Sequence, residues 1–379
     1  MKLIKIIEDK NISISNKIND FKNPKYIYIP VSNSEYKIGD YIYKNEIISN
    51  TASSISGKII GIKKVIINNI FQESYVIEND FKENIKIKSK KVKVNNKDEL
   101  IELLELHTLN TISAKLKSVA DLKNFVITCI DEECYSINQH IRLTYDYNDI
   151  LDTIDKLLNL LNIKKAILAT KNTNYKSIKN VKSVLGTYPN IKLILVPDKY
   201  LISRPNFLSN YLNLCEKDTL FLDVNELYEI YNILCIGRVK VDNLVTISGT
   251  ALKKSIVINC RNNTSLQEII SEYVDLIYED YDVYLNGLLG GIKIEEYKNL
   301  IFTKKIHTII FNKKEVKNAT KCINCGACKR ICPVNISVKK CYFKNLIANN
   351  CINCGLCNYI CPAQIDLKNK IKGDNNEKL

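Results

Sequence analysis

Cysteine is the residue type with the clearest chemical arrangement in this 379-residue sequence. Nine of the fourteen cysteines lie between Cys322 and Cys361. Two stretches share the pattern Cys-x2-Cys-x2-Cys-x3-Cys-Pro: Cys322–Pro333 and Cys351–Pro362. A cubane iron–sulfur cluster needs four thiolates in a tetrahedral arrangement, and this turn supplies three of them while a more distant cysteine supplies the fourth. The pattern therefore predicts two [4Fe–4S] clusters.

The spacing also predicts which cysteines share a cluster. In two-cluster ferredoxins the fourth cysteine of each motif binds the other cluster. We therefore expect two ligand sets: Cys322, Cys325, Cys328 and Cys361 for one cluster, and Cys351, Cys354, Cys357 and Cys332 for the other. Gly326 and Gly355 leave the backbone free to approach the sulfides. The alternative is a zinc ribbon, which needs only two Cys-x2-Cys pairs, so the longer repeated pattern favours clusters.

The remaining cysteines and the histidines have no ligand-like spacing. We predict small buried hydrophobic side chains at most of the other positions, which are Cys129, Cys134, Cys215, Cys235, Cys260 and Cys341. His107, His140 and His307 are widely separated and are not expected to bind metal. No residue of the sequence is assigned a catalytic role.

The net charge of +14 raises the question of a nucleic-acid partner. The lysines are scattered along the chain and no aromatic–basic RNA-binding motif is present, so we expect no nucleic acid. From Phe311 to Leu379 there are 13 Lys or Arg residues and 4 Asp or Glu residues. A basic collar of this kind would attract an acidic redox partner such as a small ferredoxin or flavodoxin. The alternative is that these lysines only form a solvated surface.

The expected location is cytoplasmic. No apolar run approaches the roughly 20 residues that a membrane helix needs. Near the start of the chain, Glu8 and Asp9 interrupt the isoleucines before an apolar signal-peptide region could form. Disulfides are not expected, since they belong to oxidising compartments. Peripheral attachment to the cytoplasmic face of a membrane would then depend on partner proteins.

The pattern of elements predicts a multidomain chain of α/β and α+β parts. Short alternating runs over residues 24–80 indicate a small all-β module. Strands at 125–130, 166–169 and 191–196 alternate with helices at 149–161 and 175–185, which favours a parallel sheet covered on both faces. Strands at 244–249 and 255–259 followed by a helix at 265–273 have a β-grasp order. The expected domains are 1–95, 96–240, 241–310 and 311–379.

Several segments resemble known modules. Lys37–Ile48 followed by Ala52–Ile59 resembles the barrel-sandwich hybrid fold of biotinyl and lipoyl domains, without their attachment lysine at a hairpin tip. Val245–Leu252 is similar to part of the soluble-ligand-binding β-grasp (SLBB) domain, and Asn286–Gly291 resembles its family's G-G-x-M-M-G turn. With the paired cysteine motifs, this order resembles the RnfC family of the Rnf electron-transport complex and its relative PrdC, the electron-transfer protein associated with proline reductase.

The resemblance implies an NADH- and FMN-binding middle domain like that of the complex I flavoprotein, but one motif departs from it. The family has a glycine-rich loop whose amides hold the flavin phosphate. The corresponding stretch here is Leu106–Leu116, and there is no glycine from Ile62 to Leu185. The family's acidic turn is partly kept as Asp131–Tyr135, for which an exposed acidic turn is the alternative interpretation. FMN and NADH therefore remain an alternative to the main hypothesis.

We expect an electron-transfer subunit that relays electrons through two clusters. The donor would be a reduced ferredoxin or flavoprotein, and the acceptor a partner reductase or the membrane subunits of an Rnf complex. The barrel-sandwich and β-grasp modules would serve as docking surfaces. One alternative is an NADH-oxidising, FMN-containing subunit, and another is a structural adaptor. The sequence leaves the choice between an Rnf complex and a proline reductase system open.

Overall fold

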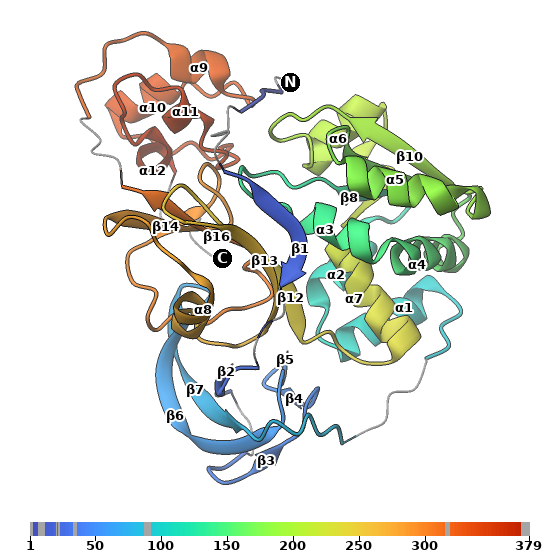
Figure 1. Cartoon of the computed structure of the whole chain (residues 1–379). Helices are drawn as coiled ribbons and strands as arrows, with labels where there is room; N and C mark the ends of the chain where they lie inside the picture. The colour runs from blue at the N-terminus through green and yellow to red at the C-terminus, as the bar shows by residue number, and fades with distance from the viewer. Residues whose placement is uncertain are drawn as a thin grey trace.

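The structure is a computed structural model that describes residues 3–6, 12–19, 21, 23–32, 36–86, 92–314 and 319–372. Figure 1 shows an N-terminal β module, a helix-covered sheet, a second mixed sheet and a C-terminal helical lobe. The expected absence of a signal peptide concerns residues 1–10, most of which lie outside the described residues. The expected cysteine domain also includes residues outside this range, at 315–318 and 373–379.

The N-terminal β module is built on one antiparallel sheet with the strand order β2-β7-β6-β3. Side chains along β2 alternate between buried and half-buried, because the Tyr-Ile-Tyr-Ile sequence has the two-residue period of a strand. Ile27, Ile29, Ile59 and Ile77 belong to the core of this module. Its strands are β2 (Tyr26–Pro30), β3 (Tyr41–Ile42), β4 (Ile47–Ile48), β5 (Thr51–Ala52), β6 (Gly57–Ile67) and β7 (Ile70–Asn79).

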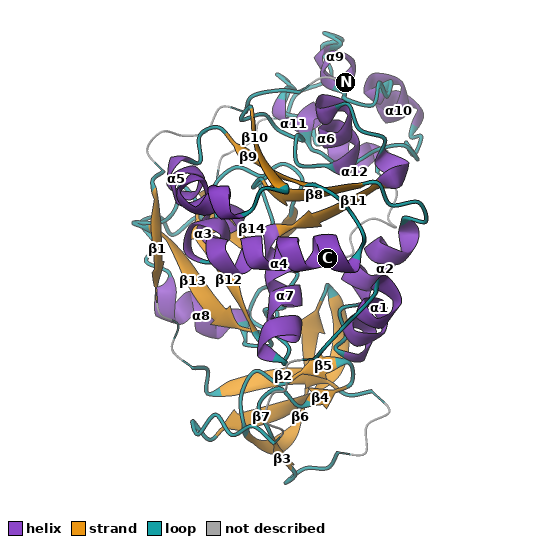
Figure 2. Ribbon diagram, turned by 90° about the vertical axis from the view of Figure 1, so that its right-hand side faces the viewer, coloured by secondary structure: helices purple, strands orange, loops and turns teal. Residues whose placement is uncertain are grey.

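The middle of the chain forms a parallel sheet with the order β10-β9-β8-β11, as its alternating strands and helices predict. One core joins this sheet to α1, α2, α4 and α7, and a second core joins its other face to the region of α6 (Figure 2). The strands are β8 (Asn124–Cys129), β9 (Ala166–Lys171), β10 (Ile191–Val196) and β11 (Thr219–Asp223). The helices are α1 (Lys97–Leu106), α2 (Asn110–Ser118), α3 (Asn138–Tyr145), α4 (Tyr147–Leu160), α5 (Tyr175–Val184), α6 (Pro205–Leu212) and α7 (Val224–Tyr231).

The third part is a six-stranded mixed sheet with the order β1-β13-β12-β16-β14-β15 and one helix, α8 (Leu266–Tyr273). Its first strand, β1, pairs in parallel with β13, so the expected domain 1–95 is wrong for residues 14–19. The expected boundary at residue 310 also falls inside β16. The strands are β1 (Ile14–Asn19), β12 (Asp242–Ser248), β13 (Ser255–Arg261), β14 (Tyr281–Leu285), β15 (Ile292–Ile294) and β16 (Thr308–Lys313).

The C-terminal lobe consists of two helix pairs, each following a cysteine turn. Its core combines apolar side chains such as Val338, Ile365 and Leu367 with the cysteines themselves. Its helices are α9 (Ala327–Ile331), α10 (Val338–Lys344), α11 (Leu356–Tyr359) and α12 (Leu367–Ile371). Across all the described residues, no helix has the length and apolar character needed to cross a membrane.

Candidate functional site

Each cysteine repeat forms a tight turn that leads into a short helix. In the first repeat, Asn324 and Gly326 have positive φ values of 59° and 70°. The equivalent residues Asn353 and Gly355 have values of 54° and 71°. Asparagine and glycine adopt this left-handed region at lower cost than other residues. The shared Ile-Asn-Cys-Gly sequence therefore accounts for the same turn appearing twice.

The cysteines of the two repeats gather around two cavities, four to each. The outer set lines the first cavity and consists of Cys322, Cys325, Cys328 and Cys361. The inner set lines the second cavity and consists of Cys332, Cys351, Cys354 and Cys357. In both sets the fourth cysteine belongs to the other repeat. The structure thus brings together the members of each expected ligand set, while their assignment to clusters stays a prediction.

The chemistry of the cavities fits an iron–sulfur core. Burial raises the pKa of the Cys357 thiol to about 12, with further contributions from Cys354 and Cys351. Burial likewise raises the pKa values of Cys354 and Cys328. Four such thiolates would be stable together only around a cationic core. Among the described residues, no group of three or more His, Cys, Asp or Glu side chains is arranged to hold a single metal ion.

The two cysteine sets differ in their exposure. Cys325 of the outer set is exposed, and Ile323 beside it is 63% exposed. Cys354 of the inner set is buried, at 8% exposure. The inner repeat packs against the α6 region, where Cys354 and Leu356 share a core with Tyr200 and Phe207 (Figure 2). The outer set therefore has one exposed cysteine, whereas no cysteine of the inner set is exposed.

Two side chains from the segment before α6 hold the inner repeat. Arg204 donates from Nη1 to the carbonyl of Ile352 at 2.8 Å. The hydroxyl of Tyr200 lies 2.8 Å from the carbonyl of Cys354 and 2.8 Å from Oε1 of Glu133. Because both contacts are to backbone carbonyls within Cys351–Cys357, they fix the position of the inner turn relative to the parallel sheet.

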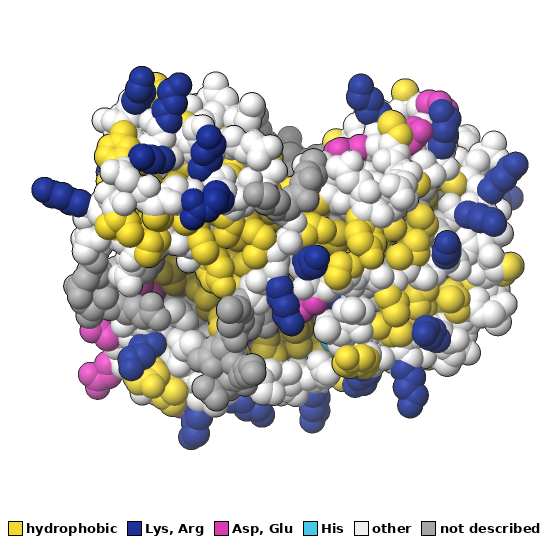
Figure 3. Space-filling view, turned by 90° about the horizontal axis from the view of Figure 1, so that it is seen from above, with side chains coloured by type: hydrophobic (Ala, Val, Ile, Leu, Met, Phe, Trp, Pro, Cys, Tyr) yellow, Lys and Arg dark blue, Asp and Glu magenta, His cyan; other side chains and the backbone are white. Residues whose placement is uncertain are grey.

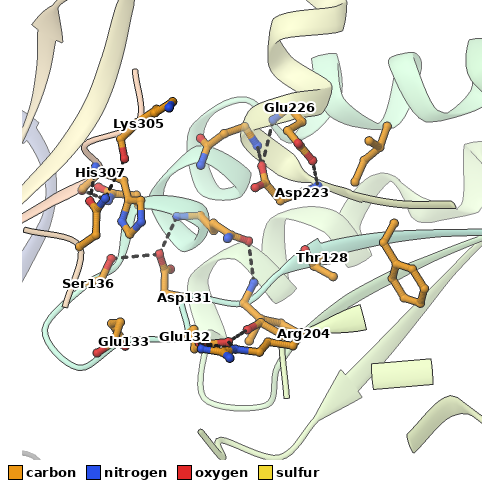
Figure 4. Close-up of a pocket in the computed structure, with 18 of the residues that line it drawn as sticks. Thr128, Asp131, Glu132, Glu133, Ser136, Arg204, Asp223, Glu226, Lys305 and His307 are labelled. Carbon is orange, nitrogen blue, oxygen red and sulfur yellow. Dashed lines mark hydrogen bonds and ion pairs between the residues drawn. The ribbon is translucent and has the colours of Figure 1, made fainter. Parts of the chain in front are cut away.

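The acidic turn after β8 is part of this contact and is not an exposed turn, so that alternative interpretation is wrong. Glu132 accepts two hydrogen bonds from Arg204, at 2.9 Å from Nε and 2.8 Å from Nη2 (Figure 4). Glu133 is buried and accepts the backbone N–H of Gly290 at 2.7 Å and of Leu289 at 3.2 Å. Burial raises the pKa of Glu133, while these hydrogen bonds oppose the increase.

The turn between β14 and β15 also contacts the inner repeat. A Cβ atom placed on Gly355 would overlap the carbonyl of Leu289. Lys368 of α12 donates to the carbonyls of Leu289 at 3.0 Å and Gly291 at 2.9 Å. Lys368 also lines the inner cavity, and burial lowers the pKa of its ammonium group. The inner set therefore contacts several parts of the chain and has a half-buried cation beside it.

A polar cavity of about 590 Å³ lies at the carboxyl ends of β8 and β11 and includes the acidic turn (Figure 4). Carboxylates outnumber cations in its lining: Asp131, Glu132, Glu133, Asp223, Glu226 and Glu229 against Lys115, Arg204, Lys304 and Lys305. Lys115 of α2 and Glu226 of α7 form an ion pair at 2.6 Å. Burial, with the nearby charge of Asp223, raises the pKa of Glu226 to about 7.

This acidic pocket does not fit a flavin phosphate. Two of the helix N-termini that would offer amides to an anion are already occupied: Asp223 accepts the N–H groups of Asn225 and Glu226, and Asp131 those of Gln139 and His140. A third, that of α6, has no side-chain cap, and its first residue is Pro205, which has no N–H. At the position of the family's glycine loop the chain forms the end of α1 and the start of α2. The N-terminus of α2 has no side-chain cap, but Lys115 of this helix, which lines the pocket, is already paired with Glu226. The excess of carboxylates further disfavours a phosphate.

The cysteines outside the two sets are only partly the buried hydrophobes that we expected. Cys129, Cys134 and Cys260 are buried, whereas Cys215 is exposed and Cys235 and Cys341 are half-buried. The expectation is wrong for Cys215 because it precedes a surface 3₁₀ turn. The three histidines are far from the cysteine sets in sequence. His307 lines the acidic pocket. Burial lowers the pKa of His140, whose Nδ1 lies 3.0 Å from the hydroxyl of Ser177.

Three residues around the inner set were not expected from the sequence: Tyr200, Arg204 and Lys368. Arg204 had a usable signal, because only five of the 55 basic residues are arginine. Arginine is preferred where a planar fork binds a carboxylate or carbonyl groups. In a chain that otherwise uses lysine, each arginine is therefore a candidate for such a contact. Tyr200 and Lys368 resemble many other Tyr and Lys residues of this sequence and offered no comparable signal.

A family model described as a 4Fe-4S binding domain matches residues 315–336. Among relatives, the chain is 21% identical over 241 residues to the C-subunit of the ion-translocating oxidoreductase complex of Buchnera aphidicola subsp. Acyrthosiphon pisum, which covers 60% of this chain and 50% of that protein. It is 25% identical over 109 residues to the protein of the same name from Methanosarcina acetivorans, covering 28% of this chain and 24% of that protein.

A different relative is the heat-inducible transcription repressor HrcA of Phytoplasma mali, which is 24% identical over 169 residues, covering 40% of this chain and 47% of that protein. Among solved structures, a chain of an NAD+-reducing [NiFe]-hydrogenase in the air-oxidized state aligns with a TM-score of 0.47 and 12% identity. That alignment covers 59% of this chain and 48% of the other. The chain spans about half the length, or less, of the curated relatives it matches.

The matches show a 4Fe-4S binding domain and a distant similarity to the C-subunits of ion-translocating oxidoreductase complexes. The 4Fe-4S match covers the whole first cysteine repeat, and the second repeat has the same spacing. Its relatives by this similarity are subunits of larger oxidoreductase assemblies, as their names state. The expectation that nucleic acid is not a partner stays a prediction.

Proposed function

We propose that this chain relays single electrons between a reduced carrier protein, a ferredoxin or flavoprotein, and a partner reductase or membrane complex. Cys322, Cys325, Cys328 and Cys361 would hold one [4Fe–4S] cluster, and Cys351, Cys354, Cys357 and Cys332 the other. Each bound cluster would supply a site that accepts and releases one electron. The chain would act in the cytoplasm, and any association with the cytoplasmic face of a membrane would be peripheral and made through its partners.

The observation that carries the proposal is the exchange of the fourth cysteine between the two cavities. Cys328 lines the outer cavity and Cys332 the inner one, at the two ends of the same short helix. Four residues of helix span about 6 Å. Cys357 and Cys361 make the same connection in the opposite direction. The ligands themselves therefore hold the two cavities close together, which a relay requires and two independent structural sites do not.

The other parts of the chain have supporting roles in this proposal. We propose that residues 24–80 are a barrel-sandwich hybrid and that residues 241–310 are an SLBB-like β-grasp domain, both serving as docking surfaces. The domain at 96–240 would hold the inner repeat through Arg204 and Tyr200. It would not hold FMN, because carboxylates outnumber cations in its pocket and Asp223 and Asp131 already accept the amides of two helix N-termini. Heat-released flavin at one equivalent per chain would contradict this part of the proposal.

The first test is the metal content of protein purified without oxygen. We expect about eight irons and eight sulfides per chain, since each cluster contains four of each. Dithionite should bleach the broad visible absorption, and the reduced protein should then pass electrons to an artificial one-electron acceptor. One or two zinc ions per chain would overturn the proposal. Clusters that are reduced but pass no electrons on would favour the structural adaptor.

The second test separates the two cavities. The variant Cys354→Ser should lose about half of the iron and retain the electron paramagnetic resonance (EPR) signal of one cluster. Electron transfer through the chain should fall by at least about tenfold. The matched control is Cys341→Ser, in the same lobe, because Cys341 is half-buried and lines neither cavity. Full iron content in Cys354→Ser, or equal loss in the control, would contradict the assignment.

A further inference from the structure

We propose that the exposed end of the C-terminal lobe is a docking face for a small acidic electron carrier, an inference that rests on the proposed relay and names its partner. The outer face is defined by the exposed apolar residues Ile323, Phe343, Leu346 and Ile347 together with the basic residues Lys321, Lys329, Arg330, Lys339, Lys340 and Lys344. The occupant is a protein with a surface redox centre surrounded by carboxylates.

Two residues of the outer face line the outer cavity. Ile323 lies between two cysteines of this set, and Lys339 of α10 lines the same cavity. Cys325 itself is exposed. The inner cavity, by contrast, is enclosed by the α6 segment and the β14–β15 turn. Because electron transfer between proteins requires close approach of the two centres, a carrier reaches this chain most closely at the outer face.

The charge of the outer face selects an acidic partner. Between residues 319 and 365 there are six Lys or Arg residues and no Asp or Glu. Two oxidised clusters with their thiolates contribute about −2 each. Nine basic residues against one carboxylate over residues 319–372 still leave this lobe near +4 when the clusters are included. Such a local field accelerates association with an acidic protein and disfavours a basic one.

The apolar part of the outer face supplies short-range contact. Ile323 and Ile347 are each 63% exposed, and Phe343 is 56% exposed. Phe343 packs edge-on against Tyr342, with ring centroids 5.3 Å apart, which holds the ring in place on the surface. In Figure 3 the left-hand lobe presents Lys and Arg side chains around apolar patches. A small apolar centre with a charged rim is the pattern of a transient protein–protein contact.

The test measures binding and electron transfer with an acidic bacterial ferredoxin as the probe and the cluster-loaded full chain as the receptor. The test variant reverses three charges of the outer face, Lys329→Glu, Lys340→Glu and Lys344→Glu. The matched control reverses exposed lysines of the α5 and β10 side, Lys179→Glu, Lys182→Glu and Lys192→Glu, so the net charge of the two proteins is equal. Iron content and reduction by dithionite are measured for both.

At low ionic strength the outer-face variant should bind the ferredoxin at least about tenfold more weakly, in line with the range of electrostatic steering, while the control changes by less than about threefold. The native complex should weaken with added salt. Equal losses in both variants, or tight binding of a basic cytochrome c instead, would overturn the proposal. If the clusters form and are reduced by dithionite but ferredoxin does not bind, only this docking face is refuted. If the chain holds no clusters, the proposed function itself is refuted.

Discussion

The first repeat, Cys322–Cys332, and the second, Cys351–Cys361, are two copies of one local structure placed in different surroundings. Their asparagines and glycines have nearly the same φ values. The first copy contacts the α6 segment through Ile331 and leaves Cys325 exposed, while the second is enclosed by the α6 segment and the β14–β15 turn. Local sequence thus determines how the cysteines are arranged, and contacts distant in sequence determine what surrounds them.

This difference gives the two cysteine sets separate tasks. The inner set consists of two buried and two half-buried cysteines, and the half-buried Lys368 lines the same cavity. The outer set is open to a partner and is surrounded by exposed basic side chains. A relay needs both, because an enclosed site keeps its environment constant while an exposed one meets the next carrier. Substitutions at equivalent positions of the two repeats can test this division.

The largest difference is expected for the glycines of the two turns. Gly355→Ala should lower the free energy of unfolding by about 2–5 kcal/mol, because it combines the strain of a left-handed alanine with overlap against the Leu289 carbonyl. Gly326→Ala should cost only about 1–2 kcal/mol, since φ is the same and the nearest atom to its Cβ is the end of Arg330 at 3.3 Å.

Anaerobic denaturant titration of the cluster-loaded variants, followed by cluster absorbance, would measure both values. Equal destabilisation by the two substitutions would show that the β14–β15 turn does not press on the inner repeat.

The next difference concerns the two arginines. Arg204 donates to Ile352 in the inner repeat, and Arg330 donates to Cys325 in the outer repeat, each at 2.8 Å. Only Arg204 also binds a carboxylate through two nitrogens. Arg204→Lys keeps the charge but loses the planar fork, so it should lower the free energy of unfolding by about 1–2 kcal/mol and speed the loss of iron from the inner set.

Arg330→Lys should have a smaller effect, because Arg330 is exposed. The rate of iron release to a chelator, with EPR to identify the remaining cluster, would separate the two. Faster loss of the outer cluster in Arg204→Lys would contradict the role given to this side chain.

The features that could be predicted from sequence are those that short segments encode. β10 coincides with the run Ile191–Val196, in which five of the six residues are aliphatic, the pattern of a short buried strand. The grouping of the cysteines into two sets of four followed from the spacing alone. In both cases the relevant residues lie within one short segment or in a repeat of it.

The features that could not be predicted depend on contacts between distant segments. Ile14 pairs with Ser255, and nothing in the sequence of β1 identifies this partner. The acidic turn was open to the wrong interpretation for the same reason: Glu133 is buried only because Tyr200 and the β14–β15 turn cover it. The sequences of the two cysteine repeats therefore do not indicate which repeat is enclosed by distant parts of the chain.

The smallest expected effect, and the most specific for the inner set, is that of Lys368. The half-buried Lys368 lines the inner cavity, where its ammonium group would stabilise added negative charge. Lys368→Met should therefore lower the reduction potential of the inner cluster by on the order of tens of millivolts, as Coulomb's law predicts for one charge at an effective dielectric constant near 20. The potential of the outer cluster should stay within about ten millivolts of its original value.

The matched control is Lys370→Met on the exposed side of the same helix, which should leave both potentials nearly unchanged because solvent screens its charge. An EPR-monitored redox titration of the three proteins measures each cluster separately. Equal shifts of both clusters in Lys368→Met would mean that the charge acts on the lobe as a whole, and the inner and outer sets would then differ in exposure but not in electrostatic environment.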